Sequence, residues 1–291
     1  MTNVGILPFY MNINEQNHRK DFAFGRSFPL ISNGGAFLPF QIVRTTSAYV
    51  IESVLLYRKD GTFVADLTLD FVSAGLEIKA KTSYDIIFYP GAMLIATEVP
   101  LGEHYLRIQD TGEWVWYSEV FTIINANENS RFLKIQYWNS TNFMYDGGEI
   151  DYTFPYRSTV YIDTQLGRPD YPFTETADER DGYLFIESQI SKKVFKFIFT
   201  APEYLIDAMR LIRMHDHIRI TNVKVPDDPD YHGKIYDVSY FLITPKWLDN
   251  GDLAEVQAEF ETGTVVKQLG KATPLTELGD FDIDYNSDYH N

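Results

Sequence analysis

The chain has 291 residues, of which 45% are hydrophobic and 15% aromatic, so it can form one large domain or two of ordinary size. Its formal net charge of −16 argues against a protein that grips nucleic-acid phosphates with clustered Lys and Arg, although DNA could still pass by it. The chain contains no cysteine, which excludes disulfides, thiol catalysis and cysteine-ligated zinc.

The sequence shows no export or membrane signal. Residues 1–30 lack a charged start followed by an apolar run and a small-residue cleavage site, and no stretch approaches about 18 consecutive apolar residues. We therefore expect a soluble protein made in a cytosol, with no membrane insertion. The 20 Tyr and 21 Phe suit half-buried pleated surfaces and favour an all-β, mainly antiparallel fold.

The first part of the chain predicts an arm followed by a sandwich. Residues 1–35 have little periodicity and predict an extended arm that gains order by lying on another surface; a loose leader is the alternative. Residues 36–125 predict an immunoglobulin-like β-sandwich, in which the Asp-Gly of "RKDGTF" favours a tight hairpin turn. The expected strands are 37–45, 49–58, 62–70, 76–80, 84–88, 103–109 and 114–124.

One hairpin of this region carries a specific likeness. "LGEHYLRI" followed by "WYSEVFTII" is similar to the last hairpin of immunoglobulin-like and fibronectin-like domains. In those folds a tyrosine marks the corner into the penultimate strand, and Tyr105 would be that residue.

The polar break "NANENS" places a domain boundary near residue 126, and the second domain is expected to run over 126–275. A strand at "RFLKIQYWNS" is followed by a long acidic loop over 141–182, with a strand at "STVYIDT" inside it. Loops of this length usually serve binding or subunit contact. "YLFIESQISKKVFKFIFT" then predicts two strands around a turn near Ser188–Lys193.

One helix is predicted, over residues 201–214. Thr200 is the expected N-cap and Glu203 completes the spacing of a capping box. Apolar residues recur on one helical face, whereas two charged residues, Asp207 and Arg210, fall on the other. The apolar face consists of Leu205, Ala208, Met209, Leu211 and Ile212.

A long hairpin over 240–262 follows, and an acidic flexible tail over 276–291 ends the chain. The second arm of the hairpin alternates strictly, with Ala254, Val256, Ala258 and Phe260 on the face predicted to pack on the core. The other face carries Glu255, Gln257, Glu259 and Glu261. A solvated sheet edge and the wall of an acidic channel remain equal alternatives for this face.

The order of elements resembles a known family. A helix such as "PEYLIDAMRLI", a short strand, a Pro/Asp loop and a hairpin of the form "YDVSYFLITPKW…DLAEVQAEFET" are similar to the core of phage tail-tube, distal-tail and tail-hub domains. The resemblance covers about residues 131–268 in order and texture and includes no invariant motif, so it carries over no catalytic residue. The preceding sandwich fits the accessory immunoglobulin-like domains of such proteins. The high content of Tyr, Phe and Asn resembles that of proteins from phages of gut Bacteroidetes.

The resemblance implies a β-barrel-like domain with one flanking helix that assembles into rings, with DNA passing through the lumen. The expected function is that of a non-enzymatic virion structural protein, a tube, hub or ring component of a phage tail. Its partners would be copies of itself and neighbouring tail proteins, with DNA only as passing cargo and without sequence-specific binding. It would be made in the bacterial host cytoplasm and located in the virion tail. Glu255, Glu259 and Glu261 are the candidate lumen-facing residues.

Clustered aromatic residues favour either a subunit interface or an alternative function. The alternative is a carbohydrate-binding β-sandwich module that contacts host surface glycans, since exposed aromatic rings stack on sugars. We expect an interface, where aromatic residues are also enriched. The candidate interface residues are Tyr137, Trp138, Phe143, Tyr145, Tyr152 and Tyr156.

Metal sites are less well supported by the sequence. His215, His217 and the more distant His232 could ligate a metal, but histidine also suits a helix C-terminus. Asp227, Asp228 and Asp230 could bind calcium, but they lack the EF-hand pattern and favour a solvated turn.

Glycosidase carboxylates could be Glu149 with Asp151, or Glu175 with Glu179, if the fold held either pair at the required separation. No G-x-S-x-G, P-loop or dinucleotide motif occurs. We therefore expect no catalytic residue, no metal site and no cofactor.

Overall fold

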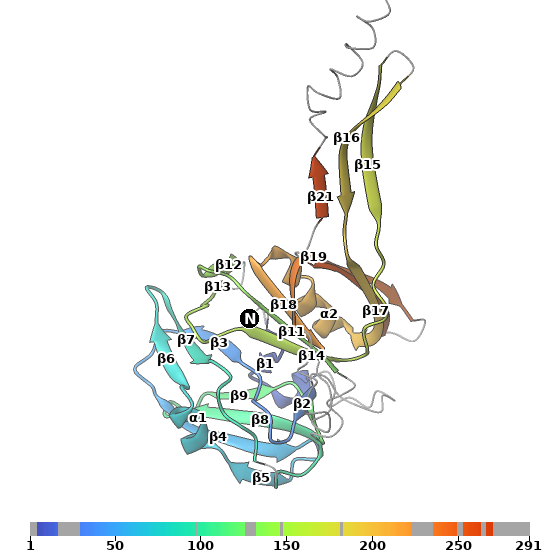
Figure 1. Ribbon diagram of the computed structural model, residues 1–291. Helices are drawn as coiled ribbons and strands as arrows, with labels where there is room; N and C mark the ends of the chain where they lie inside the picture. The colour runs from blue at the N-terminus through green and yellow to red at the C-terminus, as the bar shows by residue number, and fades with distance from the viewer. Residues whose placement is uncertain are drawn as a thin grey trace, which may run out of the picture.

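The computed structural model describes residues 5–16, 30–96, 98–125, 132–145, 148–180, 183–222, 235–248, 253–262 and 266–269 (Figure 1). Over these residues the protein is mostly β, and its strands pair antiparallel except for one parallel pair, β2 with β10. The expected mainly antiparallel β fold is therefore confirmed at this level.

Residues 9–124 form two sheets that face each other. The three-stranded sheet has the order β3-β7-β6, with β3 (Phe40–Thr45), β7 (Tyr84–Tyr89) and β6 (Glu77–Ala80). The seven-stranded sheet contains β1 (Phe9–Tyr10), β2 (Leu30–Ser32), β4 (Ile51–Arg58), β5 (Phe63–Asp66), β8 (Gly102–Asp110), β9 (Val115–Ser118) and β10 (Phe121–Ile124). The predicted arm thus supplies β1 and β2, with the short 3-10 helix η1 (Ile13–Glu15) between them.

Two predicted strands of this region are wrong in part. The expected strand 62–70 ends with β5, and helix α1 (Thr68–Ser73) follows, because the Asp66 carboxylate accepts a hydrogen bond from the Thr68 backbone N–H at 2.9 Å and starts a turn. The expected strand 114–124 is interrupted between β9 and β10. There the Ser118 hydroxyl accepts from the Leu106 N–H at 2.9 Å, so that a side chain replaces a ladder acceptor.

A buried arginine joins the two sheets. Arg44 of β3 donates to Asp110 of β8 at 2.7 Å and lies 3.5 Å from Asp85 of β7. All three side chains are buried, so the ion pairs must satisfy charges that water does not reach.

Residues 132–262 form a six-stranded antiparallel sheet with the order β14-β11-β18-β19-β20-β17. Its two outer strands, β14 and β17, share no ladder in the described residues. The Thr164 hydroxyl donates to the Ile198 carbonyl at 2.9 Å, and Asp170 bridges Val194, so the segment after β14 runs beside β17. The strands are β11 (Phe132–Trp138), β14 (Ser158–Asp163), β17 (Val194–Pro202), β18 (His217–Asn222), β19 (Ile235–Trp247) and β20 (Leu253–Thr262).

The predicted hairpin is β19 and β20, and its buried face is confirmed. Ala254, Val256, Ala258 and Phe260 are all buried, whereas Gln257 is exposed. Strict alternation in the sequence therefore identified the core face of this strand.

The predicted helix is present but shorter. Helix α2 (Glu203–Met209) is followed by the 3-10 turn η4 (Ile212–Met214). The predicted N-cap is wrong, because Thr200 lies within β17 and the N-cap position is Pro202, which makes no side-chain capping bond. The face assignment holds: Leu205, Met209 and Ile212 are buried.

The long loop predicted over 141–182 is wrong in part. The strand predicted inside it at "STVYIDT" is present as β14, but three further strands occur there: β12 (Phe143–Tyr145), β13 (Gly148–Ile150) and β15 (Phe173–Arg180). Strand β15 pairs with β16 (Tyr183–Ser191), which pairs with β21 (Val266–Leu269). This three-stranded outer sheet projects away from the rest of the molecule (Figure 1). The Gly and Pro residues that suggested a loop instead separate short strands.

Residues from both parts of the chain share one core. Leu56 and Leu106 of the seven-stranded sheet, and Leu133 and Phe241 of the six-stranded sheet, belong to the same cluster of buried apolar side chains. The sheets thus change near the predicted boundary at residue 126, while the apolar packing continues across it. The division into two domains stays a prediction.

Replacing Met209 by Asp should place an unpaired charge in this core. Met209 is 1% exposed, so we expect a loss of more than about 3 kcal/mol in the free energy of unfolding, measured by urea denaturation. Asp207→Asn is the matched control on the outer face: the Asp207 side chain is 59% exposed and lies 3.8 Å from Arg210, so we expect a change below about 0.5 kcal/mol. Equal effects from the two substitutions would contradict the assigned buried face.

Candidate functional site

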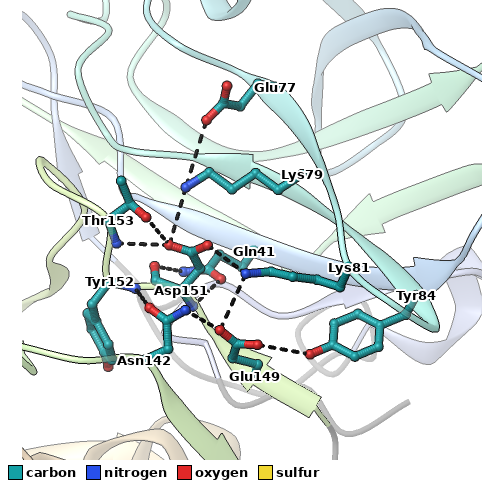
Figure 2. Close-up of polar contacts among 10 residues, drawn as sticks. All are labelled: Gln41, Glu77, Lys79, Lys81, Tyr84, Asn142, Glu149, Asp151, Tyr152 and Thr153. Atoms are coloured by element: carbon teal, nitrogen blue, oxygen red, sulfur yellow. Dashed lines mark hydrogen bonds and ion pairs between the residues drawn. The ribbon is translucent and has the colours of Figure 1, made fainter.

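The most organised group of polar side chains outside the apolar core is the lysine–carboxylate cluster of Lys79, Lys81, Glu149 and Asp151 (Figure 2). The two lysines come from β6 and the residue that follows it, and the two acids from β13 and the residue that follows it. Residues about 70 positions apart in the chain are therefore brought together.

Two lysines neutralise the two acids. Lys81 Nζ lies 3.0 Å from Asp151 Oδ2 and 3.3 Å from Glu149 Oε1, and Lys79 Nζ lies 3.2 Å from Asp151 Oδ1. Lys79 also lies 3.4 Å from the ring centroid of Phe88, where the ring face attracts a cation. Each charge in the cluster thus has an opposite charge or an aromatic face beside it.

Hydrogen bonds fix the backbone around Asp151. The Gln41 side-chain amide donates to the Asp151 carbonyl at 2.8 Å and accepts from the Asp151 N–H at 2.9 Å. The Thr153 N–H donates to the Asp151 carboxylate at 2.9 Å, and the Asn142 side chain accepts from the Tyr152 N–H at 3.1 Å. Figure 2 shows Thr153, Lys79 and Lys81 converging on the Asp151 carboxylate, while Gln41 contacts the Asp151 backbone.

The environment keeps Asp151 ionised. Burial alone would raise the pKa of Asp151, but hydrogen bonds from Thr153 and the charged bonds from Lys81 and Lys79 outweigh it and hold the pKa below its ordinary value. The Lys81 pKa moves the other way: burial would lower it, but Asp151 and Glu149 together raise it.

This pattern does not fit the acid–base pair of a glycosidase. That chemistry needs one carboxylic acid with a raised pKa and access to a sugar. Here Glu149 and Asp151 share one lysine, the Asp151 pKa is lowered, and the Asp151 side chain is only 4% exposed. The cluster instead has the properties of a structural contact that holds β6 and β13 together.

The second candidate carboxylate pair, Glu175 with Glu179, is described only in part. Glu175 is exposed on β15 and accepts a hydrogen bond from Gln189 at 2.8 Å. The side chain of Glu179 lies outside the described residues.

The histidines take separate roles. His215 is buried, contacts the Tyr152 hydroxyl and has its Nδ1 2.6 Å from the Leu211 carbonyl. Burial lowers the pKa of His215, so the ring stays neutral near pH 7. His217 is exposed and stacks on Trp138.

His232 and the aspartates at 227, 228 and 230 lie outside the described residues. Within those residues, no group of three or more His, Asp or Glu side chains has the arrangement of a metal site.

Lysines from other parts of the chain lie beside the acidic face of β20. Glu261 lies 2.9 Å from Lys192, and Glu259 lies 3.8 Å from Lys196 on the neighbouring strand. Glu255 is paired in the sheet register with Lys246 of β19. The sequence of β20 alone could not reveal these neighbours, because they come from β17, from β19 and from the turn before β17.

The candidate interface aromatics are mostly in this chain's own core. Tyr137, Tyr152 and Tyr156 are buried, and Trp138 is half-buried between His217 and Arg157. The side chains of Phe143 and Tyr145 lie outside the described residues. Large exposed aromatic side chains occur at other positions, which include Phe154, Tyr171, Phe173 and Trp247.

Sequence reasoning missed Gln41, Lys79 and Lys81, which complete the cluster. Nothing in their local pattern distinguishes them from ordinary strand residues, because the partners that give them a role lie far along the chain. A charge-alternating strand such as "EIKAK" is an equally good solvated strand.

No protein-family model, curated protein or solved structure matches this chain. In the described part of the chain, no helix is both long enough and apolar enough to span a membrane. Function must therefore be argued from the geometry itself.

Asp151→Asn should destabilise the protein near pH 7, because each of two partly buried lysines loses its nearest carboxylate. We expect a loss of about 3 kcal/mol in the free energy of unfolding. Because the folded-state pKa of Asp151 lies below 3.8, its contribution is present above that pH and is lost as the pH falls below it. The difference between wild type and variant should therefore shrink between about pH 4 and pH 2 in urea denaturation series.

Glu77→Gln provides the control for this series. Glu77 is exposed and lies 3.8 Å from Lys79, so we expect a change below about 0.5 kcal/mol at every pH. A loss for Asp151→Asn that stayed constant down to pH 2 would show that its carboxylate charge is not the source of the stability.

Proposed function

We propose that this chain is a non-enzymatic structural protein of a phage tail that assembles with copies of itself into a ring around the DNA path. The observation that carries the proposal is the outer sheet β15-β16-β21, which projects from the molecule (Figure 1) and is exposed over residues 171–177 at its base. The remaining support is the arrangement of the six-stranded sheet and the neutralised carboxylates.

The base of β15 is not covered by the described part of the chain. Residues 171–177 are all exposed, and successive residues of a strand point to opposite faces, so β15 is open to solvent on both faces there. Tyr171 is 64% and Phe173 59% exposed, which is unusual for aromatic side chains at the base of a sheet. A three-stranded sheet needs a covered apolar face to be stable, and a neighbouring copy would supply it.

The free edge of β15 points to the same kind of contact. Strand β15 is at one end of the outer sheet, so its outward N–H and C=O groups pair with no strand in the described residues. Such an edge pairs readily with a strand of another chain. Closed rings bury contacts of this kind between every pair of neighbours.

The rest of the fold is compatible with the ring. The six-stranded sheet curves until the segment after β14 lies beside β17, and helix α2 packs against it, as the resemblance to tail-tube and hub domains implies. An enzymatic function is less well supported, because the Glu149–Asp151 pair is neutralised by lysines. Neighbouring tail proteins would be the other partners, with DNA as passing cargo.

Removing the projecting hairpin should abolish assembly without unfolding the body. Asp170 and Val194 exchange hydrogen bonds of 2.8 and 2.9 Å at its base, so residues 172–192 can be replaced by a short Asn-Gly turn. We expect the full chain to form a closed oligomer in analytical ultracentrifugation and the shortened chain to remain a monomer with the same circular dichroism of its body.

A second variant separates the contact from the backbone change. Tyr171→Ser with Phe173→Ser keeps the hairpin and should weaken assembly by at least tenfold, whereas Trp247→Ser, at an exposed aromatic on another strand, should not. If the full chain is monomeric at high concentration and also in purified particles, the ring proposal is wrong. A monomer that binds glycans would support the carbohydrate-binding alternative.

The position of Glu255, Glu259 and Glu261 can be tested in particles. In a lumen, carboxylates would repel the phosphates of passing DNA, whereas lysines would hold them. Replacing all three by Lys should therefore slow or arrest DNA ejection in a lumen, more strongly at low salt. Normal ejection kinetics at low salt would place this face on the outer, solvated surface.

A further inference from the structure

A small pocket lies where residues of the first sheets meet the six-stranded sheet. It has a volume of about 160 Å³, well above the roughly 10–15 Å³ that a cavity needs to hold one water molecule. Its walls come from β11 and β14 on one side and from the segments 36–39 and 90–92 on the other. The space is large enough for one small anion or one charged side-chain head.

Two cations line this pocket, and both are on one face of the sheet. In the register of β11 and β14, Lys134 pairs with Tyr161 and Gln136 pairs with Thr159, so these side chains share a face. Arg157 lies two residues before Thr159 and belongs to the same lining. The sheet pairing therefore fixes the positions from which the two cationic side chains leave the backbone.

Aromatic rings support both cations. Lys134 Nζ lies 5.9 Å from the ring centroid of Tyr161, and Arg157 Cζ lies 4.3 Å from that of Trp138. Ring faces attract cations and limit their freedom, so the two charged groups are partly ordered before any ligand arrives.

Among the described residues, no acid neutralises these cations. None of the residues that line the pocket is acidic, and within the described part of the chain neither Lys134 nor Arg157 forms an ion pair. Asp163, two residues beyond Tyr161 on β14, does not line the pocket. In a chain of net charge −16, two adjacent half-buried cations without a carboxylate are unexpected.

The energetic cost of placing two cations close together is reflected in the pKa of Lys134. Burial lowers the pKa of Lys134, and the positive charge of Arg157 lowers it further. The ammonium form is therefore less stable here than in water, and an anion placed beside it would reduce that penalty.

The other polar side chains of the pocket, Gln136 and Thr159, already form hydrogen bonds within the protein, so the two cations are the donors that can serve a ligand. The Gln136 amide donates to the Thr159 hydroxyl at 3.4 Å, and that hydroxyl donates to the Arg157 carbonyl at 3.0 Å. Gly91 has a φ of +86°, and a Cβ there would come within 3.2 Å of Phe37 and Pro39, so glycine permits the close wall on the opposite side. The guanidinium has up to five N–H donors and suits an oxyanion.

We propose that this pocket is an oxyanion site, in which Arg157 and Lys134 together bind one carboxylate or phosphate group. The proposal stands on the pocket alone and does not depend on the tail function. The group could be free phosphate or an acidic side chain from a neighbouring protein chain; both present the same small oxyanion to the two cations.

Isothermal titration calorimetry at pH 7 and low salt, with inorganic phosphate and with acetate as separate probes, tests the site. We expect saturable one-to-one binding of at least one probe, with a dissociation constant of about 1 mM or below. Stronger binding of phosphate would favour a free phosphate, and equal or stronger binding of acetate would favour a carboxylate side chain.

Matched variants locate the binding. Arg157→Gln and Lys134→Gln should each weaken it at least tenfold, and Arg157→Lys, which keeps the charge, should weaken it less. Arg219→Gln is the control, because Arg219 is also near Trp138 but is paired with Asp237 at 3.1 Å; it should change binding less than twofold.

Circular dichroism checks that each variant is folded, and the charge-conserving Arg157→Lys keeps the test informative if another variant fails to fold. The proposal is overturned if the wild type binds neither probe saturably. It is also overturned if the two pocket variants bind as the wild type does, or if Arg219→Gln weakens binding as much as they do.

Discussion

The docking of the sheet β3-β7-β6 against residues 149–156 is the contact on which the arrangement of the molecule depends. At its centre is an apolar cluster in which Ile86 and Phe88 of β7 meet residues of the second part of the chain: Ile150, Tyr152 and Tyr156. The lysine–carboxylate cluster lies at the edge of this contact. Apolar burial supplies the stabilisation, whereas ion pairs of this kind add little net energy but penalise any arrangement that leaves a charge unpaired. The contact therefore favours one relative position of the sheets.

That same contact creates the oxyanion pocket. The segment 36–39 leads into β3 and the segment 90–92 follows β7, and they reach β11 and β14 only because the sheet is docked there. The two clusters of charge differ in one respect. Lys79 and Lys81 have carboxylates at 3.0 to 3.3 Å, whereas Lys134 and Arg157 have none in the described residues. One group of cations is satisfied by the fold, and the other is left for a ligand.

The net charge of −16 constrains how copies of this chain could assemble. Like-charged copies repel each other, but at physiological salt this repulsion is screened beyond about 8 Å. Contacts between copies must then be local, and an uncharged backbone edge with exposed aromatic side chains, such as β15 with Tyr171 and Phe173, meets that requirement. The lysines beside Glu259 and Glu261 likewise reduce the negative charge of the β20 face, which a count of its own residues would overstate.

The sequence by itself determined the features that depend on local periodicity. The alternation of β20 identified its buried face, and the helical spacing of Leu205, Met209 and Ile212 identified the packed face of α2, because burial imposes a period on neighbouring residues. It failed where side chains replace the backbone pattern, at Thr68 and Ser118, and where Gly and Pro separate short strands within 141–182.

Tertiary structure alone decided which charges are paired. From the sequence, Glu149 and Asp151 are a candidate catalytic pair, but the fold places Lys79 and Lys81 beside them. Lys134 and Arg157 do not stand out in the sequence, but the fold places them together in a pocket that no described acid lines. The physical reason is that a charge acts through space on whatever lies within a few ångströms, and the sequence does not record which distant residues those are.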